Sequence, residues 1–267
     1  MSNSTVVETF DEVAEAYAEV RPGYPECVLD RIVEYGRLTE NSRILEIGMG
    51  TGQATLGLAR RGFRVIGLEP GRRLVDIARE LLVEYPRVEV HRATFEEWAA
   101  APESYDLMFA AQSYHWAKPE VRTSKCAELL VPGGTLAIFG NWAELAASPL
   151  QEQIDAAYVR HAPELRGVDP ARDWYGGSDI PALEELRGSG RFSEVIYECF
   201  PWQRTLSSEQ YRELLGTYSW HRGIPAERLD ALLGEITGAI GGNGGQVTVE
   251  YKTGLILARS TLEGSVP

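Results

Sequence analysis

The most constraining stretch of this chain is residues 43–52, where a strand-like run meets closely spaced glycines. Residues 44–47 are mainly apolar, the pattern of a buried strand. Glycines then occupy alternate positions, namely Gly48, Gly50 and Gly52, and a helix-compatible segment starts at Gln53. Such a turn lets bare backbone approach a ligand, because a side chain would block the approach or forbid the backbone angles. The stretch therefore predicts an α/β fold with a ligand-binding turn.

The next predicted strand, residues 63–68, ends at an acid, Glu69, about 20 positions after the first glycine. An acidic residue at this point is placed to accept hydrogen bonds from ribose hydroxyls. The glycine turn and Glu69 together predict a ligand that carries a nucleoside. Two classes of enzyme use this pair: those that bind dinucleotides and those that bind S-adenosylmethionine.

The spacing of the glycines separates these two classes. A dinucleotide fingerprint needs its third glycine where this chain has Gln53. Here an acid, Glu46, precedes the first glycine, and Met49 lies within the turn. The order Glu-x-Gly-x-Gly-x-Gly resembles the first motif of class I S-adenosylmethionine-dependent methyltransferases. The resemblance implies S-adenosylmethionine as the cofactor.

Composition and charge restrict the partners of the chain. Its 267 residues are 44% hydrophobic and 24% charged, as in an ordinary globular protein, and the net charge of −13 argues against a nucleic-acid substrate. We find no apolar run long enough to cross a bilayer and no signal-peptide pattern in the first residues. The three cysteines form neither a metal spacing nor a disulfide framework. We therefore expect a cytoplasmic protein that uses no metal, nucleic acid or membrane, in an oligomeric state that the sequence leaves open.

The order of predicted elements indicates a doubly wound, mainly parallel sheet. Strands are expected near 43–47, 63–68, 88–92, 105–111, 135–140, 193–200 and 247–257. Helices are expected near 7–19, 26–36, 53–61, 71–84, 119–130, 208–217 and 225–240. We divide the chain into N-terminal helices that cover the cofactor site, an α/β core, an inserted and mainly helical cap for the acceptor, and a C-terminal part of the sheet. These parts span 1–42, 43–142, 143–190 and 191–260.

Beyond the first motif, the chain resembles small-molecule methyltransferases of the trans-aconitate methyltransferase-like subgroup. The residues that carry this resemblance are Phe10-Asp11, Tyr17, Arg21-Pro22-Gly23-Tyr24-Pro25, Thr94-Phe95-Glu96-Glu97-Trp98 and Gln112-Ser113-Tyr114-His115-Trp116. The resemblance implies a seven-stranded, Rossmann-like methyltransferase sheet whose last strand is antiparallel. It also implies that Tyr17 and Arg21 lie near the methionine end of the cofactor.

In an open parallel sheet, ligands bind beyond the carboxyl ends of the strands. This rule and the resemblance together predict the residues that contact the cofactor. They are Tyr17, Arg21, Glu46, Gly48, Met49, Gly50, Gly52, Glu69, Pro70, Thr94, Phe95, Ala111, Gln112, His115 and Trp116. Thr94 and Phe95 resemble the third motif, which meets the adenine, although many relatives have an acid there.

His115 is the candidate catalytic residue, because it follows the fourth strand and should lie near the reactive methyl. It could remove a proton or orient the acceptor, or it could simply pack with Trp116. A carboxylate acceptor would need no base. The residues expected to bind the acceptor are Tyr24, Trp142, Trp174, Tyr175, Trp220 and His221.

The predicted function is methyl transfer to a small molecule, with a hydroxyl or carboxylate oxygen as the expected acceptor and carbon or nitrogen still open. One alternative is an NAD-type oxidoreductase, against which the Gln53 position argues. Another is a non-catalytic protein that keeps only the S-adenosylmethionine pocket, with no acceptor cavity beside it. A protein acceptor also stays open.

Overall fold

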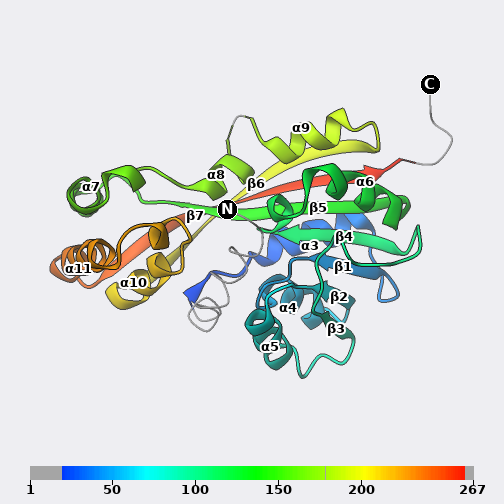
Figure 1. Ribbon diagram of the computed structural model, residues 1–267, viewed down its shortest axis with the longest axis horizontal. Coiled ribbons are helices and arrows are strands. Elements are labelled where there is room, and N and C mark those ends of the chain that lie inside the picture. Colours follow the sequence, from blue (N-terminus) through cyan, green and yellow to red (C-terminus); the bar gives the residue numbers. More distant parts are fainter. Residues whose placement is uncertain (1–19, 178, 262–267) are drawn as a thin grey trace.

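The computed structural model of the chain describes residues 20–177 and 179–261 and contains a single seven-stranded sheet (Figure 1). The strand order is β3-β2-β1-β4-β5-β7-β6. The strands are β1 (Arg43–Ile47), β2 (Arg64–Leu68), β3 (Val88–His91), β4 (Tyr105–Ala111), β5 (Leu130–Glu144), β6 (Phe192–Ser207) and β7 (Gln246–Ser260). Neighbouring strands among β1–β5 pair in parallel, whereas β7 is antiparallel to both β5 and β6. The predicted fold class is confirmed, including the antiparallel last strand.

Helices follow the strands as the alternating pattern predicts. They are α3 (Glu26–Gly36), α4 (Gln53–Arg60), α5 (Arg72–Leu81), α6 (Pro119–Leu129), α7 (Pro149–His161), α8 (Pro170–Tyr175), α9 (Pro181–Gly188), α10 (Ser208–Gly216) and α11 (Ala226–Gly242). Three 3₁₀ turns complete the set: η1 (Tyr114–Trp116), η2 (Pro163–Leu165) and η3 (His221–Gly223). The expected helix at 7–19, and with it Tyr17, lies outside the described residues.

The two faces of the sheet are covered by different helices. Alternate residues of a strand point to opposite faces, so Ile44 joins the apolar cluster under α3 and α4, while Leu45 joins the cluster under α6 and α9. Strands buried on both faces are mainly apolar, and β1 is buried from Ile44 to Ile47 with Glu46 as its one buried acid. This double covering leaves the ends of the strands as the place for a ligand.

Strands β5, β6 and β7 run well beyond the parallel part of the sheet, and helices α7, α10 and α11 gather at their far ends (Figure 1). These three helices and the far strand ends share a separate apolar cluster, which we call the outer core. Its buried members include Ile154, Leu214, Ile236, Val249 and Tyr251. Residues 143–190 therefore divide between two places, since α7 packs in the outer core while α8 and α9 pack on the main sheet.

The three late strands are longer than the sequence pattern indicated. The segment Val131-Pro132-Gly133-Gly134 precedes the expected fifth strand and has the composition of a turn, but the strand continues through it with a shift in register opposite Tyr105 and Leu107. β6 likewise runs past Pro201, which lacks a backbone N–H. β6 tolerates that proline because it is an edge strand that pairs only with β7.

Candidate active site

The glycine turn after β1 is built from backbone angles that favour glycine. Gly48, Gly50 and Gly52 have φ values of 66°, 57° and 90°, in the left-handed region. A Cβ on Gly48 would lie 2.7 Å from the Cβ of Ser113, so there is no room for a side chain at this position. A Cβ on Gly50 would meet no atom within 4 Å, which shows that open space adjoins the turn there.

Glu69 faces this turn from the end of β2 and is only 6% exposed. One of its carboxylate oxygens accepts a hydrogen bond from the backbone N–H of Gly50 at 3.0 Å. The other accepts from the N–H of Gly71, the N-cap residue of α5, at 2.8 Å. These two bonds hold the carboxylate at the mouth of the turn, where the sequence places it.

A first pocket, with a cavity of about 190 Å³, opens beyond the ends of β1, β2 and β4. Thirteen of the predicted site residues line it: Arg21, Tyr24, Glu46, Gly48, Met49, Gly50, Glu69, Pro70, Thr94, Phe95, Ala111, Gln112 and Trp116. Tyr24, which we expected to bind the acceptor, is among them. Gly52 and His115 are not. Gly52 faces α5 instead, since a Cβ there would lie 3.0 Å from the Leu82 side chain.

Ten further residues of the first pocket were not predicted: Pro22, Ile47, Thr51, Gln53, Ala54, Leu74, Ala93, Glu96, Ser113 and Ala117. Most of them directly neighbour predicted ones in the chain. Their proximity to the glycine turn and to the strand ends is the signal that would have found them. Leu74 lies one turn into α5 and gave no such signal.

Glu46, the acid before the first glycine, lies at the bottom of the first pocket and is 1% exposed. Its carboxyl group accepts a hydrogen bond from the Thr55 hydroxyl on α4. Burial, assisted by the negative charge of Glu69, raises the pKa of Glu46 to about 8. The side chain is therefore mostly protonated at neutral pH and can donate a hydrogen bond as well as accept one.

A second pocket, with a cavity of about 440 Å³, adjoins the first. Arg21, Pro22, Gln112 and Trp116 line both pockets and mark the junction between them. The rest of the lining is largely aromatic and includes the predicted Trp142, Trp174, Tyr175 and Trp220, together with Tyr218 and Tyr251. The remaining lining residues are His115, Asn141, Ala143, Asp169, Pro170, Ala171 and Ser219.

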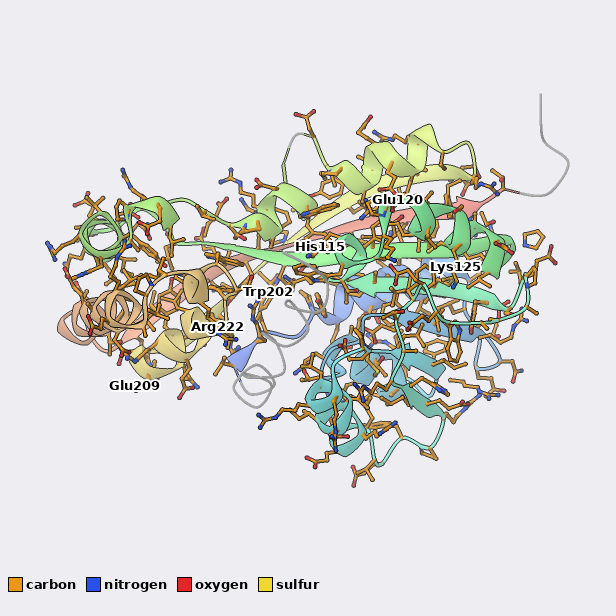
Figure 2. The ribbon with its side chains drawn as sticks, in the orientation of Figure 1. His115, Glu120, Lys125, Trp202, Glu209 and Arg222 are labelled. Atoms are coloured by element: carbon orange, nitrogen blue, oxygen red, sulfur yellow. The ribbon has the colours of Figure 1, made fainter. Side chains whose placement is uncertain are left out.

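His115 lies in this second pocket, near the middle of the molecule (Figure 2). Its Nδ1 is 3.2 Å from the hydroxyl of Tyr175, and its ring stacks on Trp174 with centroids 5.2 Å apart. Burial, together with the positive charge of Arg122, lowers the pKa of His115 to about 4. The ring is therefore neutral at pH 7 and can accept a hydrogen bond, but it is a weak base.

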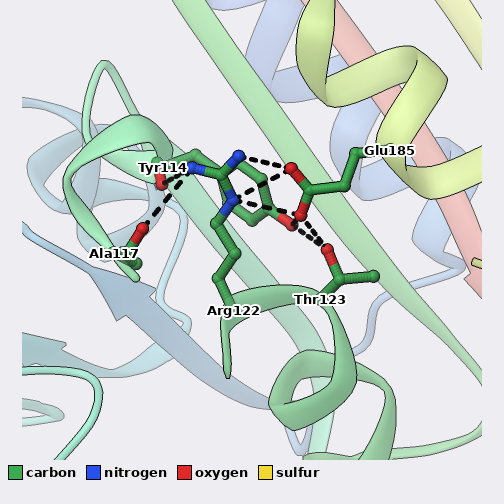
Figure 3. A network of polar contacts seen from close by, with 5 residues as sticks. All are labelled: Tyr114, Ala117, Arg122, Thr123 and Glu185. Atoms are coloured by element: carbon green, nitrogen blue, oxygen red, sulfur yellow. Dashed lines mark hydrogen bonds and ion pairs between the residues drawn. The ribbon is translucent and has the colours of Figure 1, made fainter. Parts of the chain in front are cut away.

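A buried ion pair supports the turn that carries His115 (Figure 3). The guanidinium of Arg122 pairs with Glu185 of α9 and donates to the carbonyl oxygens of Tyr114 and Ala117, each at 3.4 Å. The Thr123 hydroxyl also donates to Glu185. The guanidinium lies 5.4 Å from the ring centre of Trp174 as well. The Arg122 side chain therefore contacts both the turn at residues 114–117 and Trp174 in the wall of the second pocket.

Tyr175 sits on a pair of glycines that face each other across β5 and β7. Gly140 and Gly254 are register partners, and a Cβ on either would overlap Tyr175. The Tyr175 carbonyl also accepts a hydrogen bond from the Tyr197 hydroxyl at 2.8 Å. Because Gly140 and Gly254 carry no side chain, α8 can lie directly on the sheet, and the Tyr175 hydroxyl reaches His115.

His221, which we expected to bind the acceptor, lines neither pocket. It is 2% exposed, and its Nε2 lies 2.8 Å from the hydroxyl of Tyr158 on α7. Burial, with the nearby charge of Arg21, lowers its pKa to about 4. It packs inside the protein because η3 directs it toward α7, whereas its neighbour Trp220 faces the pocket.

Neither a metal-binding cluster nor a membrane-spanning helix is found in the described part of the chain. Within residues 20–177 and 179–261, no group of three or more histidine, cysteine, aspartate or glutamate side chains is arranged to hold a metal ion. None of the helices in these ranges is both long enough and apolar enough to span a membrane.

Comparison with known proteins agrees with this geometry. A family model described as a methyltransferase domain matches residues 44–134, which contain the glycine turn, Glu69 and the turn with His115. An uncharacterized methyltransferase-like protein of Schizosaccharomyces pombe is 26% identical over 239 residues, which are 88% of this chain and 87% of that protein. An uncharacterized methyltransferase of Mycobacterium tuberculosis is 30% identical over 167 residues, 62% of each chain.

The fold is shared with a solved structure of Haemonchus contortus phosphoethanolamine N-methyltransferase 2 in complex with phosphomonomethylethanolamine and S-adenosylhomocysteine. The TM-score is 0.59 at 17% identity, and the alignment covers 98% of this chain and 61% of that one. The match of residues 44–134, together with the sheet order around them, shows that the chain carries an S-adenosylmethionine-dependent methyltransferase domain.

Proposed function

We propose that the chain transfers the methyl group of S-adenosylmethionine to an oxygen atom, hydroxyl or carboxylate, of a small molecule held in the second pocket. The observation that carries this proposal is the junction of the two pockets at Arg21, Pro22, Gln112 and Trp116. A methyl donor in the first pocket and an acceptor in the second would meet there. Catalysis of methyl transfer is mainly a matter of holding donor and acceptor in line, which two joined pockets can do.

The residues of the first pocket suit an adenosyl ligand. In this proposal the Glu69 carboxylate accepts hydrogen bonds from the ribose hydroxyls, and the bare backbone at Gly50 leaves room for the ligand. Arg21 lies at the junction, where its planar guanidinium can hold the methionine carboxylate. When bound, the cofactor supplies an electrophilic methyl group on a sulfonium.

His115 would orient the acceptor rather than act as a strong base. Its pKa of about 4 makes it neutral at pH 7, and the Tyr175 hydroxyl fixes its ring through Nδ1. The neutral ring can then receive a hydrogen bond from an acceptor hydroxyl. A carboxylate acceptor needs no proton removal and agrees equally well with a weak base.

The alternatives fit the site less well. A protein that only binds the cofactor would need no second cavity, whereas one adjoins the first pocket here. The methyltransferase-domain match over the glycine turn argues against an oxidoreductase. The Haemonchus protein, which shares the fold, binds a small acceptor. This likeness and the net charge of −13 support a small-molecule acceptor over a nucleic acid, and we propose a cytoplasmic location.

The proposal is tested by a screen of small hydroxy and carboxylic acids for uptake of labelled methyl from S-adenosylmethionine. We expect transfer to at least one compound, with S-adenosylhomocysteine as the second product. Binding of S-adenosylhomocysteine without transfer to any compound would support the cofactor-binding alternative instead.

The cofactor pocket is tested separately through Glu69. Replacement Glu69→Ala removes the predicted partner of the ribose hydroxyls, and we expect calorimetry to show at least about tenfold weaker binding of S-adenosylhomocysteine. The control is Glu80→Ala, which removes an exposed carboxylate from α5 without touching the pocket. Equal affinity in the Glu69 and Glu80 variants would contradict the proposed ribose contact.

A further inference from the structure

Several aromatic side chains of the second pocket are partly uncovered, and one of them, Trp116, also lines the first pocket. Trp116 is 41% exposed and is the aromatic member of the exposed large apolar side chains in the described residues. Trp174, Tyr218 and Trp220 are half-buried and also line the pocket. Uncovered aromatic faces of this extent mark a place where another molecule binds.

The aromatic walls are held in fixed orientations. Trp220 stacks on Tyr218 with ring centres 4.4 Å apart and an angle of 12° between the planes. On another part of the wall, Trp174 stacks on His115 at 5.2 Å and 27°. Because each ring already has a stacked neighbour, the faces that remain can receive a ligand without first becoming ordered.

Polar groups in this pocket are largely engaged by the protein itself. The Gln112 amide donates to the Asn141 carbonyl oxygen at 3.2 Å and accepts from the Tyr24 hydroxyl. The Asn141 side chain donates to the carbonyl oxygen of Gly23 and accepts from the Thr253 hydroxyl. A sugar-like or polyanionic acceptor would need many polar partners, so this lining disfavours it.

The charged groups of the pocket also have contacts within the protein. The Asp169 carboxylate accepts hydrogen bonds from the N–H groups of Ala143 and Ala171, at 3.4 and 3.0 Å, and caps α8. The Arg21 guanidinium donates to Thr217 and lies 4.5 Å from the ring centre of Tyr218. A cationic acceptor would meet the positive charge of Arg21, while the Asp169 carboxylate is held against the backbone of Ala143 and Ala171.

We propose that the acceptor is a planar aromatic molecule, neutral or anionic, whose ring stacks on the aromatic side chains of Trp116, Trp174 and Trp220. The inference rests on the proposed function, since it names the class of acceptor for the same site. Recognition through ring faces agrees with the aromatic walls and with the engagement of Gln112, Asn141 and Asp169 by the protein itself. A flat acceptor would also present an edge, with its oxygen, toward the junction at Trp116.

The test compares flat and saturated compounds of the same outline. Calorimetry in the presence of saturating S-adenosylhomocysteine measures the affinities of 2-naphthol, 2-naphthoate, their decahydro counterparts and tetraethylammonium. We expect at least one naphthalene compound to bind about tenfold tighter than its decahydro counterpart, because ring stacking adds to the burial of apolar area. Equal or weaker binding of the flat compounds, or no binding of any, overturns the proposal. Tightest binding of tetraethylammonium overturns it in favour of a cationic acceptor.

Substitutions of Trp220 test whether the preference for flat over saturated compounds arises in the second pocket. In Trp220→Leu we expect the flat-to-saturated preference to fall to about twofold, and in Trp220→Phe we expect it to recover, because the ring face returns. The control is Trp98→Leu, since Trp98 lies outside both pockets and bonds to Tyr105, and its ratio should equal that of the wild type. An unchanged ratio in Trp220→Leu overturns the placement.

The failure of this inference can be told apart from the failure of the proposed function. Binding of S-adenosylhomocysteine is measured first. Its absence contradicts the proposed function, whereas normal binding without an aromatic preference contradicts only the acceptor class.

Discussion

In the proposed mechanism, His115 contributes mainly through its position. Its ring is fixed by Tyr175 and Trp174 and lines the second pocket but not the first. We expect His115→Ala to lower kcat by at least about tenfold, because the acceptor loses an orienting contact. The affinity for S-adenosylhomocysteine should change by less than about twofold. Labelled-methyl turnover and calorimetry measure the two quantities, and unchanged turnover would remove His115 from the mechanism.

Glu46 predicts a specific pH dependence of stability. Its pKa is about 8 in the folded protein and near the ordinary value of 4.5 in the unfolded chain. Between these values the unfolded chain releases the proton while the folded protein keeps it, so stability is lost as pH rises. Relative to Glu46→Gln, the free energy of unfolding of the wild type should fall by up to about 3 kcal/mol from pH 5 to pH 8. Urea unfolding at several pH values measures this, and parallel pH curves would contradict it.

Single residues also show what the sequence could and could not predict. Glu69 was predictable because its distance along the chain from the glycines and its place at a strand end fix its position. The assignment of His115 to the second pocket was not, because the chain bends at Gln112, whose φ of +56° nothing in the local sequence signals. That angle is held by long-range bonds from Gln112 to Asn141, Phe139 and Tyr24.

At the scale of elements, the Arg122–Glu185 pair joins α6 to α9 beneath the His115 turn (Figure 3). Removal of one partner leaves the other charged and largely buried, so Glu185→Ala should lower the free energy of unfolding by about 3 kcal/mol. The double variant Arg122→Met with Glu185→Leu should recover most of this stability, because it leaves no unpaired charge. Denaturant unfolding provides the measurement. Equal loss in both variants would show that the pair itself stabilises the fold.

The lengths of the late strands were the least predictable elements. Pro132, Gly133 and Gly134 have the composition of a turn, yet antiparallel pairing of β5 with β7 begins directly after them at Thr135 and continues to Glu144. The capping box at Ser207 and Gln210, in contrast, joins residues only three positions apart, so the local sequence is enough to form it. Local signals thus gave the helix starts, whereas the extent of a strand depended on its partner.

At the scale of the whole molecule, the outer core is packed separately from the main sheet clusters. Ile236 of α11 is fully buried there, and Ile236→Ala should cost about 2–5 kcal/mol through lost apolar contacts. We expect hydrogen exchange to speed up in α7, α10 and α11 more than in β1, β2 and β4. Binding of S-adenosylhomocysteine should stay within about twofold of the wild type. Uniform acceleration over the whole sheet would show that the two regions unfold as one unit.

The glycine pair beneath Tyr175, Gly140 and Gly254, limits which substitutions the second pocket can tolerate. Even one methyl group at Gly140 or Gly254 would lift α8 from the strands and carry Tyr175 away from His115. Trp220 lies on the connection between α10 and α11, outside this glycine pair. Mutagenesis that aims to change the acceptor should therefore vary residues near Trp220 in the second pocket and leave Gly140 and Gly254 unchanged.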